Sequence, residues 1–493
     1  MKTSSRRLKS EEYRNTAALL RLFGGDVRGG RRLTPDRSRR LIAERDRLLA
    51  DCLAAGARFH EGNKAKIYSG RLSPGCVACA RGTWLCLYLE KRCNRRCFFC
   101  PKEKTLSGRV PFENMALTRL DVSGDLETFI RELRYADVSF SGGEPFLEFE
   151  RLLSYVKRAR TALGKTGHVW VYTNGDFVTA SRLRRLTAAG LDEIRINLSA
   201  RGYDTAPVRL AKRHIRRVTV EIPAVPERLD RVRALLPELA ALGVDHLNLH
   251  ELKVTPYNEQ RLARGGYSFA RGQKACSVVE SELTALRLLK ESLEKKIRLS
   301  VNFCSQCYRE RFQQRAYQRV LAEWFVRKAP HRGFSVVRET GLLRRVYFEN
   351  GAERARSPKS GGVLRREGEK CYVRPESLDA PALKARTVFL EYSVCRPTDD
   401  PRESAATLEV SGRTFFHVKR VGLRSVPLRR WEERRLFKKM FLGSRSPGEI
   451  LNGSSFGGKN ERRRAALARA MEKMRSAFDG LETLPRGLPV KYA

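Results

Sequence analysis

Three cysteines lie within eight residues in the segment "CNRRCFFCP", at Cys93, Cys97 and Cys100. A disulfide needs two cysteines and a structural zinc site needs four ligands, so three indicate a metal centre with one open position. Thiolates at C-x3-C-x2-C spacing can hold three irons of a [4Fe–4S] cluster and leave the fourth iron to a small ligand. The alternative is a zinc site completed by a remote cysteine or histidine. The spacing favours iron–sulfur, because zinc modules usually pair C-x2-C units.

A glycine-rich motif with one acidic residue follows the second expected strand. The segment "SFSGGEP" places Gly142, Gly143, Glu144 and Pro145 at the carboxyl end of an expected strand at 136–142. Two glycines let a ligand approach the backbone closely, and the carboxylate offers a partner to a cationic amine. Alone, Gly-Gly-Glu-Pro is also compatible with an ordinary turn. Its order and spacing after the cysteine triplet favour a ligand site.

Together these motifs resemble those of the radical SAM superfamily. The cysteine loop resembles its C-x3-C-x-aromatic-C loop, and "GGEP" resembles its motif for the amino group of S-adenosylmethionine. The segments "YTNG" (172–175) and "NLSA" (197–200) resemble its ribose- and carboxylate-contacting positions. The resemblance implies a [4Fe–4S] cluster on the three cysteines. The cofactor contacts that it implies are Phe99, Gly142, Gly143, Glu144, Pro145, Thr173, Asn174 and Ser199.

The resemblance also implies a reaction. S-adenosylmethionine would chelate the open iron, an electron from the reduced cluster would cleave its C–S bond, and the 5′-deoxyadenosyl radical would abstract hydrogen from a substrate. The implied partner is an electron donor similar to flavodoxin or ferredoxin. Residues 70–325, including "SPGCVACARGTWLCLYL" and "VNFCSQCYRERFQQRAYQRV", further resemble a group related to pyruvate formate-lyase activating enzymes. That resemblance does not identify the substrate.

Two C-x2-C pairs form a candidate second metal site, at Cys76 with Cys79 and at Cys304 with Cys307. Together they would bind an auxiliary iron–sulfur cluster or a zinc ion, with Cys86 or Cys276 as a substitute ligand. The pairs lie more than two hundred residues apart in the chain. Free thiols, or separate sites, therefore remain the alternative.

Strand-like and helix-like segments alternate through the middle of the chain, which predicts βαβ units and a parallel sheet. The expected strands are 84–90, 136–142, 168–175, 193–200, 217–225, 246–252 and 298–304, and the expected helices are 148–163, 180–189, 227–242 and 279–296. We therefore expect an α/β fold, and the resemblance implies a partial (β/α)6-type radical SAM barrel. We divide the chain into a basic N-terminal helical arm (1–75), the barrel (76–310) and a smaller basic α+β region (311–493). A helix is expected at 35–55 in the arm and a basic helix at 460–478 near the end.

Polar residues lie along two expected strands, at Glu221, Asn248, His250 and Glu251. They act on substrate as proton or hydrogen-bonding groups, or they satisfy one another inside a polar barrel. For His250 the second role is favoured, because buried polar groups usually find partners.

The chain is strongly basic. It has 98 Lys and Arg against 55 Asp and Glu, a formal net charge of +43 over 493 residues. Such a charge attracts polyanions, RNA among them, although a solvated basic surface is the alternative. The apolar fraction of 41% supports a large core, and no apolar run is long enough for a membrane span. Twelve cysteines without a secretory signal indicate metal binding in a reducing cytoplasm.

Three functions remain open at this point. The first is a radical SAM enzyme that acts on RNA or another polyanion. The second is the same chemistry on a protein, peptide or small metabolite, including activation of a glycyl-radical enzyme. The third is a non-enzymatic iron–sulfur protein that binds nucleic acid as a sensor. The third is disfavoured because a sensor needs no amine-binding strand end.

Overall fold

The computed structural model describes ten segments and one further residue. They are residues 34–90, 92–100, 126–255, 257–271, 276–349, 363–373, 387–398, 407–411, 414–427, 481–482 and 488. The basic helix expected at 460–478 lies outside the described residues. No helix in the described part of the chain is both long and apolar enough to cross a bilayer.

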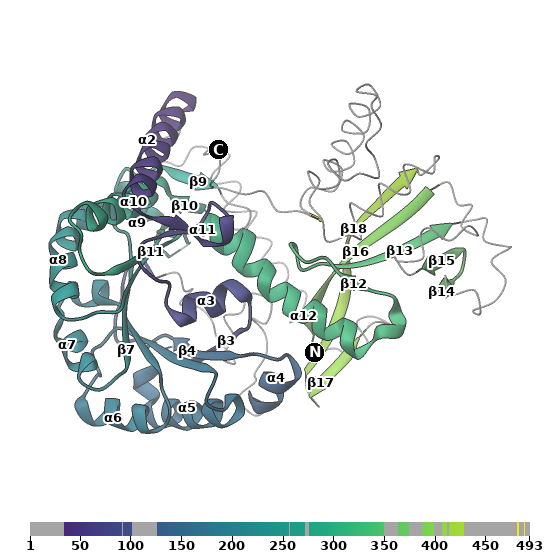
Figure 1. Ribbon diagram of the computed structural model, residues 1–493, viewed down its shortest axis with the longest axis horizontal. Coiled ribbons are helices and arrows are strands. Elements are labelled where there is room, and N and C mark those ends of the chain that lie inside the picture. Colours follow the sequence, from purple (N-terminus) through teal and green to yellow (C-terminus); the bar gives the residue numbers. More distant parts are fainter. Residues whose placement is uncertain are drawn as a thin grey trace.

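A curved, mainly parallel sheet forms the larger part of the molecule (Figure 1). Its parallel strands are β3 (Trp84–Glu90), β4 (Asp137–Gly142), β5 (His168–Thr173), β6 (Glu193–Ile196), β7 (Arg217–Pro223), β8 (His246–His250) and β11 (Ser300–Cys304). They lie side by side in chain order, and two short antiparallel strands, β2 (Ile67–Tyr68) and β1 (Arg58–Phe59), extend the sheet beyond β11. Since β3 and β1 are the two edges, the barrel is open, and the expected partial barrel is confirmed.

Helices cover the outer face of the sheet (Figure 1). They are α4 (Leu126–Glu132), α5 (Phe149–Leu163), α6 (Ala180–Ala188), α7 (Ala206–Lys212), α8 (Leu229–Ala241) and α10 (Val279–Glu294). Apolar side chains at helical spacing, such as Leu152 and Val156 of α5, are fully buried in the same core as Val169 and Val171 of β5. Burial of these faces is the main source of stability for such layers. After β8, helix α9 (Glu259–Arg264) and the hairpin β9 (Phe269–Arg271) with β10 (Cys276–Val278) precede α10.

In the described residues, two α-helices precede β3, the first of the parallel strands. Helix α2 (Pro35–Ala54) confirms the helix expected at 35–55; Thr34 caps its amino end, where Oγ1 accepts a hydrogen bond from the Arg37 backbone N–H at 3.2 Å. It packs on α10, with an Arg37–Glu280 ion pair at 3.1 Å. Helix α3 (Pro74–Arg81) lies within the curve of the sheet (Figure 1).

The C-terminal part is a mostly antiparallel sheet joined to the barrel by α12 (Gln314–Lys328). Its strands are β12 (Ser335–Val336), β13 (Leu343–Glu349), β14 (Val363–Glu367), β15 (Lys370–Val373), β16 (Thr387–Thr398), β17 (Leu408–Ser411) and β18 (Thr414–Pro427). Trp324 of α12 packs on Phe416 of β18, with ring centroids 5.2 Å apart. The expected α+β region is therefore confirmed. The domain limits at residues 75 and 310 stay a prediction.

Most of the expected strands are one or two residues shorter than predicted, and the strand expected at 193–200 falls furthest short. The segment 193–200 ends as a strand at Ile196, because Asn197 starts a 3-10 turn, η3 (Leu198–Arg201), and its side chain accepts a hydrogen bond from the Ser199 N–H at 3.1 Å. Residues 58–68, which the sequence assigns to the N-terminal arm, contribute β1 and β2 to the barrel sheet.

Candidate functional site

The predicted cofactor residues lie at the carboxyl ends of four neighbouring strands. The cysteine loop follows β3, the glycine motif ends β4 and leads into a 3-10 turn, η2 (Pro145–Glu148), Thr173 ends β5, and Ser199 lies in η3 after β6. Neighbouring parallel strands carry their carboxyl ends to the same edge, which is where α/β barrels place their active sites. The structure therefore brings these residues together. Their binding of a cofactor stays a prediction.

Gly142 allows the end of β4 to approach the segment that leads into the cysteine loop. Its φ is +137°, and a Cβ atom there would lie 2.3 Å from the carbonyl oxygen of Glu90. Next to it, the N–H of Gly143 donates to that oxygen at 2.5 Å, and the N–H of Glu144 donates to the Arg92 carbonyl at 2.9 Å. A side chain at position 142 would force these two strand ends apart.

The Glu144 side chain is fully buried and holds two strand ends together. Its Oε1 accepts hydrogen bonds from the Phe146 N–H at 3.1 Å and the Thr173 hydroxyl at 2.8 Å, and its Oε2 accepts one from the Asn174 N–H at 2.7 Å. Burial raises the pKa of this carboxyl above its ordinary value, although the hydrogen bonds act in the opposite direction. These contacts give Glu144 a positioning role. Its predicted contact with an amine stays a prediction.

The cysteine loop presents three thiols, and the Cys93 sulfur has two nearby N–H donors. Cys93 Sγ accepts from the Arg95 N–H at 3.4 Å and from Asn174 Nδ2 at 3.8 Å, and the Cys100 N–H donates to the Cys97 carbonyl at 3.1 Å. Burial raises the pKa of Cys97 to about 11, and the charges of the other two cysteines act in the same direction. No three acidic, cysteine or histidine side chains in the described residues are arranged around a single metal ion. The donor set fits a larger cluster, whose thiolates typically receive N–H hydrogen bonds.

Asp176 fixes the cysteine loop, and the sequence analysis did not identify it. Its carboxylate accepts two hydrogen bonds from Arg95, from Nε at 2.5 Å and from Nη2 at 2.7 Å, and further ones from Arg201 and Asn94. The hydrogen bonds from Arg95 lower the pKa of Asp176 below its ordinary range. Asn174 Nδ2 adds a bond to Asn94 Oδ1 at 2.7 Å. The loop after β5 therefore holds the loop after β3, and only the position of Asp176 directly after "YTNG" hinted at this role.

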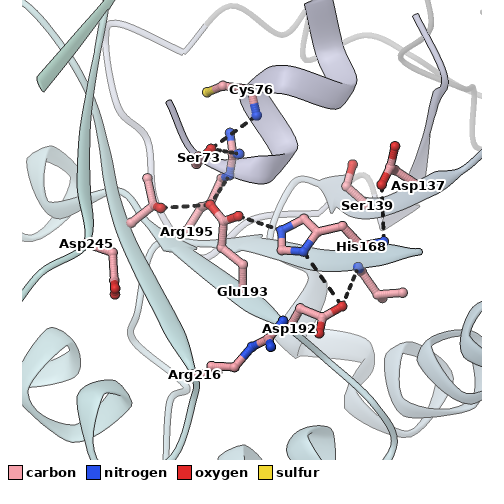
Figure 2. Close-up of polar contacts among 12 residues, drawn as sticks. Ser73, Cys76, Asp137, Ser139, His168, Asp192, Glu193, Arg195, Arg216 and Asp245 are labelled. Atoms are coloured by element: carbon pink, nitrogen blue, oxygen red, sulfur yellow. Dashed lines mark hydrogen bonds and ion pairs between the residues drawn. The ribbon is translucent and has the colours of Figure 1, made fainter. Parts of the chain in front are cut away.

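A buried ionic network lies inside the curve of the sheet. Figure 2 shows Arg195 of β6 between Ser73, which precedes α3, and Glu193. The guanidinium donates from Nε to Glu193 Oε1 at 2.8 Å, from Nη1 to Glu221 Oε2 at 2.9 Å and from Nη2 to Ser73 Oγ at 2.8 Å. It also lies over the Trp170 ring, 5.2 Å from the centroid. The network joins α3 to two strands of the barrel.

His250 is hydrogen-bonded within this network, as predicted. Its Nε2 lies 2.7 Å from Glu221 Oε1, and Asn248 Nδ2 donates to Glu221 Oε2 at 3.0 Å. Burial alone would raise the pKa of Glu221, but the charges of His250 and Arg195 outweigh it and hold that pKa well below its ordinary range. Glu251 lies apart from this set: the Gln306 N–H donates to its Oε2 at 2.7 Å, and burial raises its pKa to about 8.

The structure brings three of the four second-site cysteines near one buried lysine. Burial raises the pKa of Cys79 to about 12 and also raises that of Cys304, while the neighbouring Lys66 ammonium acts in the opposite direction on both. The charge of Cys76 also raises the pKa of Cys79 and that of Cys304. The groups that influence Cys307 are instead Arg311 and three glutamates, Glu251, Glu282 and Glu310. In the described part of the chain no three of these cysteines are arranged so that they could hold one metal ion, and the second site stays a prediction.

Comparisons of sequence find one matching family. Residues 88–222 match the family model of the Radical SAM superfamily. A protein of Methanocaldococcus jannaschii, named as a glycyl-radical enzyme activating enzyme, is 27% identical over 296 residues, which cover 57% of this chain and 75% of that protein. A GTP 3',8-cyclase of Mycobacterium sp. is 34% identical over 153 residues, covering 31% of this chain and 37% of the cyclase.

Solved structures give partial matches. The radical S-adenosylmethionine methyltransferase TsrM of Kitasatospora setae, with cobalamin and a [4Fe-4S] cluster bound, aligns at a TM-score of 0.28 and 14% identity, covering 48% of this chain and 52% of that chain. Coproporphyrinogen III oxidase of Escherichia coli aligns at 0.28 and 14%, covering 46% of this chain and 56% of that chain. The chain thus spans about half the length of these two structures.

Proposed function

We propose that this chain, a member of the radical SAM superfamily related to the activating enzymes, cleaves S-adenosylmethionine reductively at a [4Fe–4S] cluster held by Cys93, Cys97 and Cys100. The cluster, when bound, would supply the electron that breaks the sulfonium C–S bond to give methionine and a 5′-deoxyadenosyl radical, which would take a hydrogen atom from a substrate. The observation that carries this proposal is the cysteine loop, which Asp176 and Asn174 hold beside the ends of β4, β5 and β6.

The chain's own residues would position this chemistry. Asn174 and the Arg95 N–H donate toward Cys93 Sγ, and such bonds to a thiolate sulfur tune a cluster's reduction potential. Glu144 would keep the ends of β4 and β5 in register, so that Gly142 and Gly143 present backbone to the cofactor. Phe99 and Ser199 both line one pocket, which lies beside the cysteine loop.

For the substrate we propose RNA or another polyanion. The net charge of +43 supports this class. Binding driven by phosphate contacts must weaken with salt, with a slope of about −0.7 in log K against log salt for each contacted phosphate of a single strand. Titration of a single-stranded oligoribonucleotide at several salt concentrations measures this slope. A flat salt dependence would contradict the proposal.

A protein substrate is the second candidate, because the Methanocaldococcus relative is named as an activating enzyme. This function would require hydrogen abstraction from a glycine of a partner enzyme. It predicts a specific protein complex whose affinity depends on surface shape as well as on charge.

We also propose an acidic electron donor, similar to flavodoxin or ferredoxin, and a cytoplasmic location. Arg96 is exposed in the cysteine loop, so it is available to such a donor. Reduced thiols and a reducible cluster both need a reducing compartment.

For the second metal site we propose an auxiliary iron–sulfur cluster on Cys76, Cys79, Cys304 and Cys307. Lys66 supports an anionic thiolate centre at this place, and a zinc ion on the same four thiolates is the alternative. Its side chain is 1% exposed and lies over the Tyr308 ring, 4.5 Å from the centroid. A buried ammonium is costly unless a negative charge compensates it, and a cluster with four thiolates is an anion.

One experiment tests the central proposal. The full chain is reconstituted anaerobically with iron and sulfide, its iron is counted, and release of 5′-deoxyadenosine is assayed with dithionite. We expect about four irons for one such cluster, or about eight with an auxiliary cluster, together with deoxyadenosine. Iron without deoxyadenosine under good reduction would contradict the enzymatic proposal and favour the sensor.

A further inference from the structure

Five arginines line a pocket of about 520 Å³ beside the cysteine loop. We call it the arginine pocket; its arginines are Arg95, Arg96, Arg228, Arg231 and Arg261. Arg95 and Arg96 come from the cysteine loop, whereas the other three come from other elements, at the end of the 3-10 turn η4 (Pro226–Arg228), in the first turn of α8 and in α9. Apolar side chains, among them Phe98 and Val225, complete the lining.

Most of this positive charge has no acidic partner in the described residues. Arg95 is paired with Asp176, but no described ion pair joins Arg96, Arg228, Arg231 or Arg261 to a carboxylate. Other contacts orient two of them. The Arg261 guanidinium lies over the Phe98 ring, 4.4 Å from the centroid, and Arg231 Nη2 donates to a backbone carbonyl, that of Tyr203, at 3.5 Å.

S-adenosylmethionine does not supply the missing negative charge. The molecule carries a sulfonium, an ammonium and one carboxylate, so its net charge is positive. A cluster with three thiolates is negative, but it would lie on the side of Cys97, next to Arg95 and Arg96. Arg228, Arg231 and Arg261 lie outside that loop in the sequence and are exposed, so their guanidinium groups are available to a further anion.

We propose that Arg228, Arg231 and Arg261 bind a phosphate group of the substrate. Three guanidinium groups suit a phosphate, because it offers several oxygens and up to two charges to their paired N–H donors. A carboxylate has one charge and two oxygens and would leave arginines unmatched. The amino end of α8 adds to the same potential, since no described side chain caps it. The identification of the phosphate carrier as the substrate rests on the proposed function. Phosphate binding itself can be measured separately.

The test is a calorimetric titration of the reconstituted full chain with inorganic pyrophosphate. The variant Arg228→Gln with Arg231→Gln removes two charges, and we expect its affinity to fall at least about tenfold. The double variant Arg228→Lys with Arg231→Lys keeps the charges and loses the paired donors. Its affinity should therefore lie between those of the wild type and the glutamine double variant. The control is Arg184→Gln, an exposed arginine of α6 outside the pocket, and it should match the wild type. Thermal unfolding of each variant verifies the fold.

Several outcomes separate this inference from the proposed function. No pyrophosphate binding by the wild type, or equal affinity in the glutamine double variant and the control, overturns the phosphate site. Pyrophosphate binding that depends on Arg228 and Arg231 supports it even if the wild type releases no deoxyadenosine, in which case the proposed function fails alone. Competition then identifies the source: displacement by a nucleoside triphosphate indicates a nucleotide, and stronger displacement by an oligoribonucleotide indicates an RNA backbone.

Discussion

The carboxylate of Asp176 binds the guanidinium of Arg95 through two hydrogen bonds, from Nε at 2.5 Å and from Nη2 at 2.7 Å. Arg95 lies between two of the cluster cysteines, and Asp176 follows β5. This one ion pair therefore connects the loop that would hold the cluster to the strand end that would hold the cofactor. The Arg95 side chain is 41% exposed and that of Asp176 only 11%, so the carboxylate is the more buried member of the pair.

Replacing Asp176 with Asn should make the cysteine loop less stable. The amide keeps the size of the side chain but loses the charge that Arg95 and Arg201 share. Hydrogen bonds to charged partners contribute roughly 1.5–3 kcal/mol, and partial exposure reduces this to about 1–2 kcal/mol here. We expect iron to be lost roughly tenfold faster from the reconstituted variant under a chelator. Glu150→Gln, which removes an exposed carboxylate paired with Arg185, is the control; equal rates in both variants would argue against the role of Asp176.

Each of the three loop cysteines should be essential. Cys93→Ala, Cys97→Ala and Cys100→Ala remove one of only three protein ligands, so each should abolish deoxyadenosine release while the chain stays folded. Cys371→Ala, in β15 of the C-terminal sheet, also removes one cysteine and should retain activity. Measured release from any of the three loop variants would refute the assignment of the cluster.

Glu144→Ala should weaken cofactor binding. The substitution leaves the buried N–H groups of Phe146 and Asn174 and the Thr173 hydroxyl without their acceptor, at a cost of about 2–3 kcal/mol. We expect a lower affinity for S-adenosylmethionine at unchanged iron content, measured by equilibrium binding and by iron analysis. Loss of iron together with the cofactor would mean that Glu144 acts mainly on the cysteine loop.

The stability of the chain should decrease as the pH rises above about 5, in part because of Glu251. Burial, followed by the charge of Glu282, raises the pKa of Glu251 from 4.5 to about 8. Between these values the folded chain binds a proton that the unfolded chain has released, so the free energy of unfolding falls with pH, by up to about 1.4 kcal/mol per pH unit. Stability from this group is present below pH 4.5 and is lost as the pH passes 8.

The variant Glu251→Gln cannot ionise, so its unfolding midpoint should change less between pH 5 and 8 than that of the wild type. Midpoints from thermal unfolding in anaerobic buffers provide the comparison. Glu150→Gln again serves as an exposed control, and a parallel pH dependence in all three proteins would remove Glu251 as the cause.

Much of the barrel could be predicted from the sequence, because the strands are buried on both faces and the helices on one. The apolar runs that start at Trp84 and Arg217 begin strands at those residues in the structure. The end of β6 was predicted too late, because the Asn197 side chain accepts a hydrogen bond from the Ser199 N–H. Such a local bond competes with strand pairing, and apolar periodicity does not capture it.

The contacts of the site were less predictable. Cys93 and Glu144 belong to motifs, but Asp176 and Arg201 are ordinary polar residues whose partner lies in another loop. Their pairing depends on the order of strands in the sheet, and nothing in the spacing of charges reports it. The same reason explains Lys66: a lysine beside three cysteines is visible only once β2 and β11 are adjacent.

The Arg195 network constrains how this barrel can diverge over evolutionary time. Glu193 and Glu221 share one buried guanidinium, so loss of Arg195 leaves two carboxylates without their cation and costs roughly 3–5 kcal/mol. Replacement of all three by apolar residues of similar volume carries no such penalty. Sequences descended from a common ancestor should therefore keep Glu193, Arg195 and Glu221 together or exchange them together, a pattern of correlated substitution set by electrostatics and not by catalysis.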